Sequence, residues 1–325
     1  MSDSADATLA GTLNGKVITV LGGSGFLGRH VAQELLARGA RLRIASRNPE
    51  RAYRSKLLGN LGQVAFTRVD ITRPASLASA LVGSHAVVNL VGAFAGDLDA
   101  VQGVGAGRVA AAAKTAGATA FVQISAIGAN AQSSVAYART KAEGEAAVLA
   151  AFPEATILRP SLLFGSDDNF LNMFAKLIST LPALPVFGPD AKLQPLFVDD
   201  AAVAIAQALA APAVHGGKIY EIAGPEVITM LELHRRIASA QGRSRSFIAL
   251  PDAVSSAIAK ATGWLPGAPI TSDQWELLKA GSVASGAMPG IRDLGVQPRP
   301  LGLFLDRWMV SYRKHGRFGA TPSVG

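Results

Sequence analysis

Short β-branched runs alternate with helical segments from residue 16 onward, and this alternation constrains the fold more than any other feature of the chain. The run KVITVL (16–21) opens onto the glycines of GGSGFLG, and a helical pattern follows from Phe26 to Arg38. The same pattern predicts strands at 41–45, 64–69, 86–91, 121–125 and 156–158, with helices at 74–82, 100–115 and 137–151. Helices of this length between strands build βαβ units and a parallel sheet with right-handed crossovers. We therefore predict an α/β protein.

The alternation loosens after residue 158, which divides the chain into expected regions. We predict a nucleotide-binding domain over 15–165, to which 195–225 returns with a strand at 196–198, a helix from Asp200 and a late strand at 219–222. We predict a smaller, mostly helical lid domain that consists of residues 166–194, with a helix at 170–179, and residues 226–300. Proline residues interrupt both stretches. A flexible N-terminal tail (1–14) and a basic amphipathic docking tail (301–325) complete the expected organisation.

Gly22, Gly25 and Gly28 follow the first strand directly and open the first helix. The backbone N–H groups at a helix N-terminus carry partial positive charge and can hold phosphate groups. In such a site Gly22 permits the tight turn, Gly25 allows the approach of a pyrophosphate and Gly28 allows close packing of helix and strand. Glycine turns without a ligand are common, but the position of this one between a strand and a helix favours a dinucleotide site.

The end of the second strand indicates which dinucleotide is bound. Many dinucleotide sites place an acid there, which accepts hydrogen bonds from the adenosine ribose, but this strand ends Ala45-Ser46-Arg47. A guanidinium at this position suits the 2′-phosphate of NADPH, and a plain surface arginine is the alternative. The other cations between Arg38 and Lys56 either add to the same field or form a solvated face. We therefore predict NADPH rather than NADH.

Ser125, Tyr137 and Lys141 are the candidates for catalytic chemistry. Tyr137 and Lys141 lie four residues apart on one face of a predicted helix, and Ser125 ends the preceding strand at the carboxyl edge of the sheet. A lysine beside a tyrosine favours the phenolate, so Tyr137 could act as an acid or base near neutral pH. Ser125 could polarise a carbonyl group, and Lys141 could hold a ribose. A tyrosine and a lysine at this spacing can also be a surface accident.

Several motifs together resemble the extended and atypical short-chain dehydrogenases over residues 15 to 225. They are GGSGFLG, the ASR strand end, Asp70-Ile71, VVNLVG, Ser125 with YARTK, LRPSLLFG and PLFVDDAA. The resemblance implies a Rossmann-type doubly wound parallel sheet, with adenine beside Asp70, the adenosine side lined by 89–92 and the nicotinamide beside 160–163. The candidate cofactor-binding residues are then Gly22, Ser24, Gly25, Phe26, Leu27, Gly28, Arg47, Asp70, Ile71, Leu90, Val91, Gly92, Tyr137, Lys141, Pro160 and Leu163.

A narrower resemblance spans nearly the whole chain. LGNLGQVAF, AFPEATILRPSLLFG, DNFLN, MPGIRDLGVQPRPL and a basic aromatic tail are similar to the NADPH-binding accessory subunits of respiratory complex I. This likeness implies NADPH in a structural or redox-sensing role and contact with core subunits of the peripheral arm near the membrane. It also implies a peripheral place on the cytoplasmic face of a bacterial inner membrane, or on the matrix side in a mitochondrion.

Two other interpretations stay open. Ser125, Tyr137 and Lys141 are vestigial in an accessory subunit, but they are the expected set of a free-standing NADPH-dependent reductase or epimerase. The third interpretation is an NADP(H)-gated regulatory binding module without catalysis.

The tail repeats apolar residues at helical spacing, and cations follow them. Leu301, Phe304, Leu305, Trp308 and Tyr312 share this spacing. An apolar face beside a cationic end suits a groove on a partner or a membrane interface with anionic lipid. The alternative is a final helix that packs on the protein's own small domain.

Composition excludes several other classes of function. The chain has no cysteine, which excludes disulfides, thiolate metal sites and cysteine nucleophiles, and His315 has no second ligand spaced near it, so no metal site is predicted. The acidic N-terminus argues against secretion, and the apolar stretch 201–214 is too short to span a bilayer. The net charge of +8 permits nucleic-acid binding, but no such motif occurs and none is predicted. Asp199 and Asp200 are interpreted as helix N-cap residues, and Trp264 and Trp275 as core or interface residues.

Overall fold

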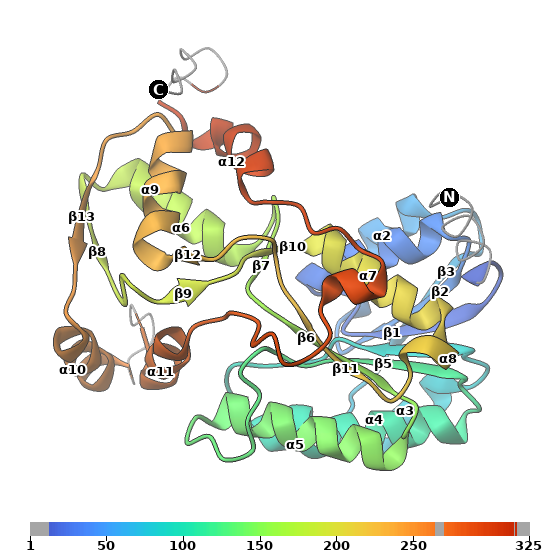
Figure 1. Ribbon diagram of the computed structural model, residues 1–325. Helices are drawn as coiled ribbons and strands as arrows, with labels where there is room; N and C mark the ends of the chain where they lie inside the picture. The colour runs from blue at the N-terminus through green and yellow to red at the C-terminus, as the bar shows by residue number, and fades with distance from the viewer. Residues whose placement is uncertain (1–12, 264–269, 315, 317–325) are drawn as a thin grey trace. The chain divides into compact units, whose positions relative to one another are not determined.

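The computed structural model describes residues 13–263, 270–314 and 316, without the side chains of 54–58 (Figure 1). Most of the predicted flexible tail, together with Trp264, His315 and residues 317–325, lies outside the described residues. Leu13, which the prediction included in that tail, is instead buried in the core, and its carbonyl oxygen accepts a hydrogen bond from the Lys16 N–H.

The chain divides into two compact units. The first contains the residues up to Pro160, Val198–Ile222 and Ser285–Gln297, and the second contains Ser161–Phe197, Ala223–Ala284 and the residues from Pro298 onward. The return to the first unit thus begins at Val198 rather than at residue 195. The later return of 285–297 was not predicted.

A seven-stranded, fully parallel sheet with the order β11-β6-β5-β4-β1-β2-β3 forms the first unit. Its strands are β1 (Val17–Leu21), β2 (Arg41–Ser46), β3 (Val64–Arg68), β4 (Ala86–Asn89), β5 (Ala120–Ile124), β6 (Thr156–Pro160) and β11 (Ile219–Ile222). The strand order reverses between β1 and β4, and ligands of open α/β sheets bind at such a point, beyond the carboxyl ends of the strands.

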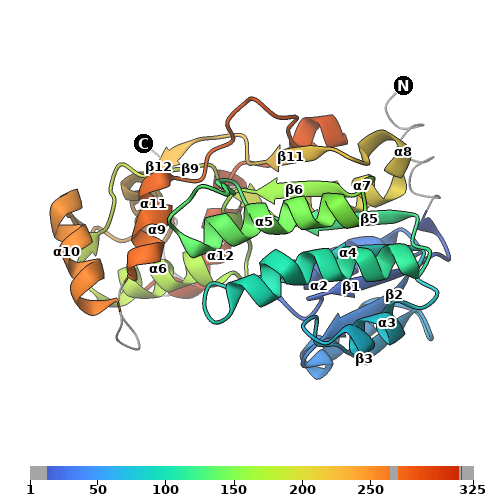
Figure 2. The same ribbon diagram turned by 90° about the horizontal axis from the view of Figure 1, so that it is seen from below.

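Helices cover both faces of this sheet, which confirms the predicted doubly wound fold (Figures 1 and 2). On one face lie α2 (Phe26–Ala37) and α7 (Val198–Ala210), and on the other lie α3 (Pro74–Leu81), α4 (Val104–Thr115) and α5 (Ala136–Ala151). Shorter helical segments are η2 (Pro49–Leu58), the π-helical turn η3 (Asp99–Gly103), α8 (Pro212–His215) and η4 (Ile291–Leu294).

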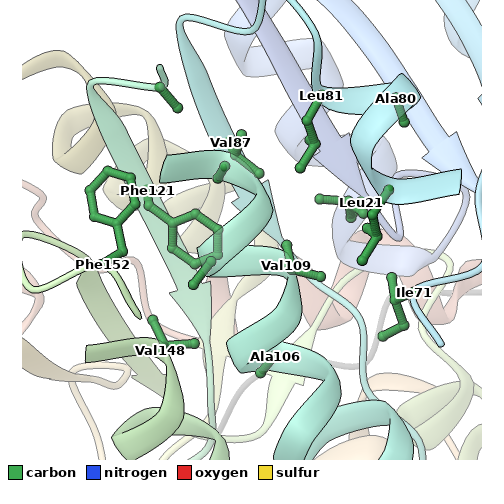
Figure 3. Close-up of a cluster of buried hydrophobic side chains, with 14 of the residues drawn as sticks. Leu21, Ile71, Ala80, Leu81, Val87, Ala106, Val109, Phe121, Val148 and Phe152 are labelled. Atoms are coloured by element: carbon green, nitrogen blue, oxygen red, sulfur yellow. The ribbon is translucent and has the colours of Figure 1, made fainter. Parts of the chain in front are cut away.

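An apolar core fills the space between the sheet and the face formed by α3, α4 and α5 (Figure 3). Leu21 and Val87 project from β1 and β4, and Val109 meets them from α4. The rings of Phe121 and Phe152 lie 5.6 Å apart between β5 and the end of α5. Because strands of a parallel sheet are buried on both faces, their sequences read as continuous apolar runs.

The second unit contains more strand than the predicted mostly helical lid. Its helical elements are α6 (Asn169–Thr180), α9 (Met230–Ala240), α10 (Asp252–Thr262), α11 (Ser272–Ala280), α12 (Gly302–Trp308) and η5 (Met309–Tyr312). Three two-stranded sheets join them, formed by β7 (Leu163–Phe164) with β10 (Leu196–Phe197), β9 (Lys192–Leu193) with β12 (Ile228–Thr229), and β8 (Ala183–Val186) with β13 (Ser246–Ala249). The predicted strand 196–198 therefore pairs with β7 and not with the central sheet. Trp275 is buried in a small core of this unit, as predicted.

The predicted docking tail is wrong for its apolar face, which packs inside the second unit. Leu301, Leu305 and Met309 are buried. The ring of Phe304 stacks on that of Phe197 with centroids 4.1 Å apart, and the Tyr312 hydroxyl donates a hydrogen bond of 2.8 Å to Asn172 Oδ1. The open alternative, a final helix on the protein's own small domain, is thus the observed one. Amphipathic spacing predicts that one face of a helix is buried, but it does not identify the surface that covers this face.

Candidate functional site

The glycine turn joins β1 to α2 at the point where the strand order reverses. Gly22 has φ +78°, and its N–H donates a 2.9 Å hydrogen bond to the Ala45 carbonyl oxygen of β2. A Cβ at Gly22 would lie 3.2 Å from the carbonyl carbon of Leu90, the residue that follows β4. The turn therefore requires glycine at this position both for its backbone angle and for its close approach to the neighbouring strand end.

The start of α2 packs directly on the backbone of this turn. A Cβ at Gly28 would lie 2.6 Å from Gly23 Cα and 2.7 Å from the Gly22 carbonyl oxygen, so no larger residue fits without displacing backbone. A Cβ at Gly23 would lie 2.9 Å from Ile44 Cγ2. Gly23 was not among the predicted residues, although the doubled glycine of GGSG was a visible signal for it.

Gly25 differs from these positions because little surrounds it. It is the N-cap residue of α2, and a Cβ there would meet only the Gly22 carbonyl oxygen, at 3.3 Å. The first N–H groups of a helix have no intrahelical acceptor, and here the chain places Phe26, Leu27 and Gly28 in that first turn. The geometry therefore offers backbone donors with little steric obstruction to an anion such as a phosphate.

Polar groups lie at the ends of β2 and β3, at the same edge of the parallel sheet as this turn. The Ser46 hydroxyl is buried and has no hydrogen-bond partner within the described part of the chain, and exposed Arg47 follows it. Asp70 Oδ1 accepts hydrogen bonds from the Thr72 hydroxyl (2.7 Å) and the Thr72 N–H (3.0 Å), which hold the pKa of Asp70 below its usual value, with smaller contributions from Arg73 and Arg47. Asp70 is thus ionised and ready to accept hydrogen bonds.

Ile71, the residue after Asp70, has an apolar side chain that lies in the protein core. It is buried in the core on the α3–α5 face of the sheet, where Figure 3 shows it. A role of Ile71 at the site would have to come from its backbone.

A buried amide network fixes the chain after β4. Asn89 Nδ2 donates to Gln123 Oε1 at 2.8 Å, and Asn89 Oδ1 accepts from the Val91 N–H at 3.2 Å. Gln123 Nε2 donates in turn to the Ile124 carbonyl oxygen at 2.9 Å. Leu90, Val91 and Gly92 are therefore held at the strand end. Gln123 was not predicted, because an amide within an apolar strand gives no functional signal until its neighbour across the sheet is known.

The structure brings Lys141 to this strand end. Its side chain is buried, its Nζ donates a 3.3 Å hydrogen bond to the Ile124 carbonyl oxygen, and a Cβ at Gly92 would lie 3.1 Å from that Nζ. Ser125 follows Ile124 directly, and its hydroxyl is buried without a hydrogen-bond partner among the described residues. An unpaired buried hydroxyl costs free energy, which a bound polar ligand would recover.

The expectation that Lys141 favours a Tyr137 phenolate is wrong for this structure. Burial raises the pKa of Tyr137 to about 12, and burial lowers the pKa of Lys141 to about 8, partly offset by Glu145. The Lys141 Nζ lies 5.8 Å from the centroid of the Tyr137 ring. The Phe94 ring stacks on the Tyr137 ring, with 4.6 Å between their centroids. Desolvation of the phenolate therefore outweighs the attraction of the ammonium group.

Removal of the Phe94 ring should bring the pKa of Tyr137 back toward its usual value. Phe94 is 72% exposed, so Phe94→Ala uncovers Tyr137 without opening a cavity in the core. We expect the ionisation of Tyr137, measured by ultraviolet absorbance as the difference between each protein and its Tyr137→Phe partner, to move from about pH 12 to lower pH. An unchanged midpoint in Phe94→Ala would show that deeper burial, and not the stacked ring, controls this hydroxyl.

The remaining predicted residues are dispersed over the two units. Pro160 ends β6 in the first unit, and Leu163 opens β7 in the second. Asp199 and Asp200 lie in the first turn of α7 rather than at an N-cap, and Asp199 Oδ1 pairs with His30 Nδ1 at 2.5 Å.

No group of three or more histidine and acidic side chains in the described ranges could hold a metal ion. In the same ranges, no helix combines the length and apolar character that a membrane crossing needs.

Known proteins with similar sequences and folds fit this geometry. The sequence model of the NAD dependent epimerase/dehydratase family matches residues 18–223. The chain is 32% identical to the Arabidopsis thaliana protein named NADH dehydrogenase [ubiquinone] 1 alpha subcomplex subunit 9, mitochondrial, over 96% of this chain and 82% of that protein. It is 30% identical to a ceramide reductase of Caulobacter vibrioides, over 73% of this chain and 74% of the reductase.

A solved structure shows the same fold. An NADPH-dependent quinone oxidoreductase of Escherichia coli, complexed with NADPH, superposes with a TM-score of 0.71 at 22% identity, over 89% of this chain and 99% of that one. Because the family match covers the glycine turn, the strand ends after β4 and β5 and the Tyr137–Lys141 helix, this chain belongs to the NAD dependent epimerase/dehydratase family and is a relative of the alpha subcomplex subunit 9 proteins.

Proposed function

We propose that this protein is an NADPH-binding accessory subunit of a respiratory NADH:ubiquinone oxidoreductase and that the cofactor supports its assembly, stability or redox sensing. One observation carries the proposal: the likeness to the Arabidopsis thaliana subunit extends over 96% of this chain, far beyond the family region that ends at residue 223. Most of the chain after residue 223 is thus shared with a protein whose name places it in that complex.

The first unit offers the groups that a dinucleotide needs. The turn from Gly22 to Gly28 would hold the pyrophosphate on backbone N–H groups, and Asp70 would accept hydrogen bonds on the adenosine side. The buried hydroxyls of Ser46 and Ser125 lack partners among the described residues, which is expected where a ligand supplies them. Lys141 would donate to the nicotinamide ribose. When bound, the cofactor supplies a hydride, which a structural role would leave unused.

A reductase is the second candidate function. Ser125, Tyr137 and Lys141 are all retained, and Lys141 reaches the carbonyl oxygen of the residue before Ser125. A bacterial relative named ceramide reductase adds to this candidate. Turnover of a carbonyl substrate that the isolated protein loses on Tyr137→Phe would favour it over the accessory subunit.

We also propose a peripheral location, on the cytoplasmic face of a bacterial inner membrane or the matrix side in a mitochondrion, beside core subunits of the peripheral arm. The apolar face of α12 is buried, so contact with anionic lipid would fall to cations such as exposed Arg307 and Lys314. Such contact should weaken as ionic strength rises.

Arg47 should determine the preference for NADPH. It is exposed at the end of β2, where its guanidinium can meet a 2′-phosphate. We expect the protein to bind NADPH more tightly than NADH by about 1–3 kcal/mol, and Arg47→Ala to remove most of that difference. Titration calorimetry with both cofactors measures it, with Arg51→Ala, a nearby exposed arginine, as the matched control. Equal affinity of the unmodified protein for both cofactors would contradict the assignment.

Membrane extraction tests the functional proposal as a whole. Solubilised with a mild detergent, the native membranes should yield this chain in the same fraction as NADH:quinone oxidoreductase activity. Deletion of its gene should reduce the assembled complex, and a Tyr137→Phe version should restore it fully. A chain that never migrates with that activity would refute the proposal and leave the reductase as the better candidate.

A further inference from the structure

A buried ion pair lies one helical turn beyond Lys141. Arg159 of β6 donates from Nε to Glu145 Oε1 at 2.8 Å and from Nη2 to Glu145 Oε2 at 2.6 Å, and both side chains are largely buried. A two-point contact of this kind holds both partners in one orientation. Buried charges are costly unless they are paired, so this pair needs a reason beyond stability.

The pair is extended on its far side by Glu221 of β11. Arg159 Nη1 lies 3.9 Å from Glu221 Oε1, and Glu221 Oε2 accepts hydrogen bonds from the Ser285 N–H (2.6 Å) and hydroxyl (2.7 Å). The Glu221 N–H also donates to the Pro289 carbonyl oxygen at 3.0 Å. These contacts explain why 285–297 returns to the first unit, and they place a carboxylate on each side of the Arg159 guanidinium.

Lys141 lies four residues before Glu145 on α5, so the two side chains share one face of the helix. The other groups around the ammonium are Tyr137 on α5, the Ile124 carbonyl oxygen of β5 and Gln102 of η3, which reaches the same glycine, Gly92. Glu145 raises the pKa of Lys141 against the larger effect of burial. Among the described charges that face this lysine, Glu145 is therefore the one that favours the ammonium form, and Arg159 divides the attraction of that carboxylate.

We propose that Glu145 and Arg159 are positioning residues that set the place and the charge of Lys141 beside the candidate nicotinamide ribose. The proposal rests on the proposed cofactor site and adds a role for residues outside it. Glu145 holds the lysine as an ammonium that attracts the cofactor and donates hydrogen bonds to it. Arg159 limits how strongly Glu145 does so, and Glu221 with Ser285 fixes the guanidinium.

Two single substitutions should act in opposite directions. Glu145→Gln removes the carboxylate that favours the ammonium form, so the lysine should lose its proton at lower pH. Arg159→Gln frees the full charge of Glu145 for Lys141, so the lysine should keep its proton to higher pH. Each shift should be about one pH unit. The double variant Glu145→Gln with Arg159→Gln should fall between the two.

The titration of Lys141 can be followed directly in the full-length protein. Lysine labelled with ¹³C at Cε gives a chemical shift that reports protonation, and the resonance absent from Lys141→Arg identifies the right one. The midpoint of the unmodified protein is expected near pH 8. The affinity for NADPH, from the fluorescence of the bound nicotinamide, should fall above the same midpoint in each protein. Glu154→Gln, which removes an exposed carboxylate paired with Lys114, is the matched control and should move neither.

The outcomes separate the inference from the proposed function. Shifts of opposite sign in both measurements support it. Shifts of the same sign, or affinity lost equally at every pH with an unmoved lysine midpoint, would overturn it and leave the ion pair structural. If Glu145→Gln fails to fold, Arg159→Gln and the double variant still decide. The proposal expects a higher Lys141 midpoint in Arg159→Gln, and a structural role of the ion pair does not. Opposite lysine shifts in a protein that binds no NADPH would refute the cofactor site and retain the pair's effect on Lys141.

Discussion

Gly25→Ala should keep the fold and weaken NADPH binding, whereas Gly28→Ala should destabilise the fold. The two changes are the same, three residues apart, but a Cβ at Gly25 meets only one atom at 3.3 Å, while a Cβ at Gly28 overlaps backbone at 2.6 Å. We expect Gly28→Ala to reduce the free energy of unfolding by about 3 kcal/mol, as overpacking of an interior does. Gly25→Ala should weaken NADPH binding by about 30- to 100-fold, because its methyl group points into the space where a pyrophosphate would meet the helix N-terminus.

Thermal unfolding and NADPH titration of both variants check this contrast. Gly83→Ala is not a suitable control because its φ of +71° adds strain, whereas Gly302→Ala, at an exposed position with open space around it, should change neither quantity. Full NADPH affinity in folded Gly25→Ala would contradict the prediction that the pyrophosphate binds at this turn.

Leu305→Ala should destabilise the second unit, and Leu303→Ala should not. Both leucines lie on α12, but Leu305 is 4% exposed and Leu303 is 66% exposed. Truncation of a buried leucine costs about 3 kcal/mol, while exposed positions cost less than about 0.5 kcal/mol. Near-ultraviolet circular dichroism reports the loss of packing around Trp308, whose ring lies 4.9 Å from that of Phe304.

Truncations extend the same test to the whole tail. Removal of everything after Pro300 takes away Leu301, Leu305 and Met309 and should unfold the second unit, because the rings of Phe164 and Phe197 lose their cover. A well-folded, fully soluble product of this truncation would restore the interpretation of this segment as a separate docking element.

Prediction from sequence succeeded where the controlling interactions are local. β1, the glycine turn and α2 were placed within a residue of their observed bounds, since a β-branched run, a glycine with positive φ and a 3.6-residue period each act over a few neighbouring residues. The parallel direction of the strands followed from the βαβ connections. The clustering of Lys141 with the end of β5 followed from the rule that carboxyl ends of parallel strands meet at one edge.

Prediction failed where distant partners decide the outcome. The periodicity of residues 301–312 demanded burial, and only the presence of Phe197 and Asn172 decided that the burial is internal. The strand at 196–197 could pair with any exposed strand edge, and in the structure it pairs with β7.

The amino-acid sequence by itself determined the α/β class, the glycine turn, the absence of thiol chemistry and the residue types at the candidate site, because composition, period and spacing are properties of the chain alone. Only the tertiary structure decided that 285–297 joins the first unit through Glu221, that Tyr137 stays protonated and that Arg159 shares its charge between two carboxylates. Protonation and ion pairing depend on desolvation and on distances of a few ångströms between segments far apart in the chain, and no local pattern encodes those quantities.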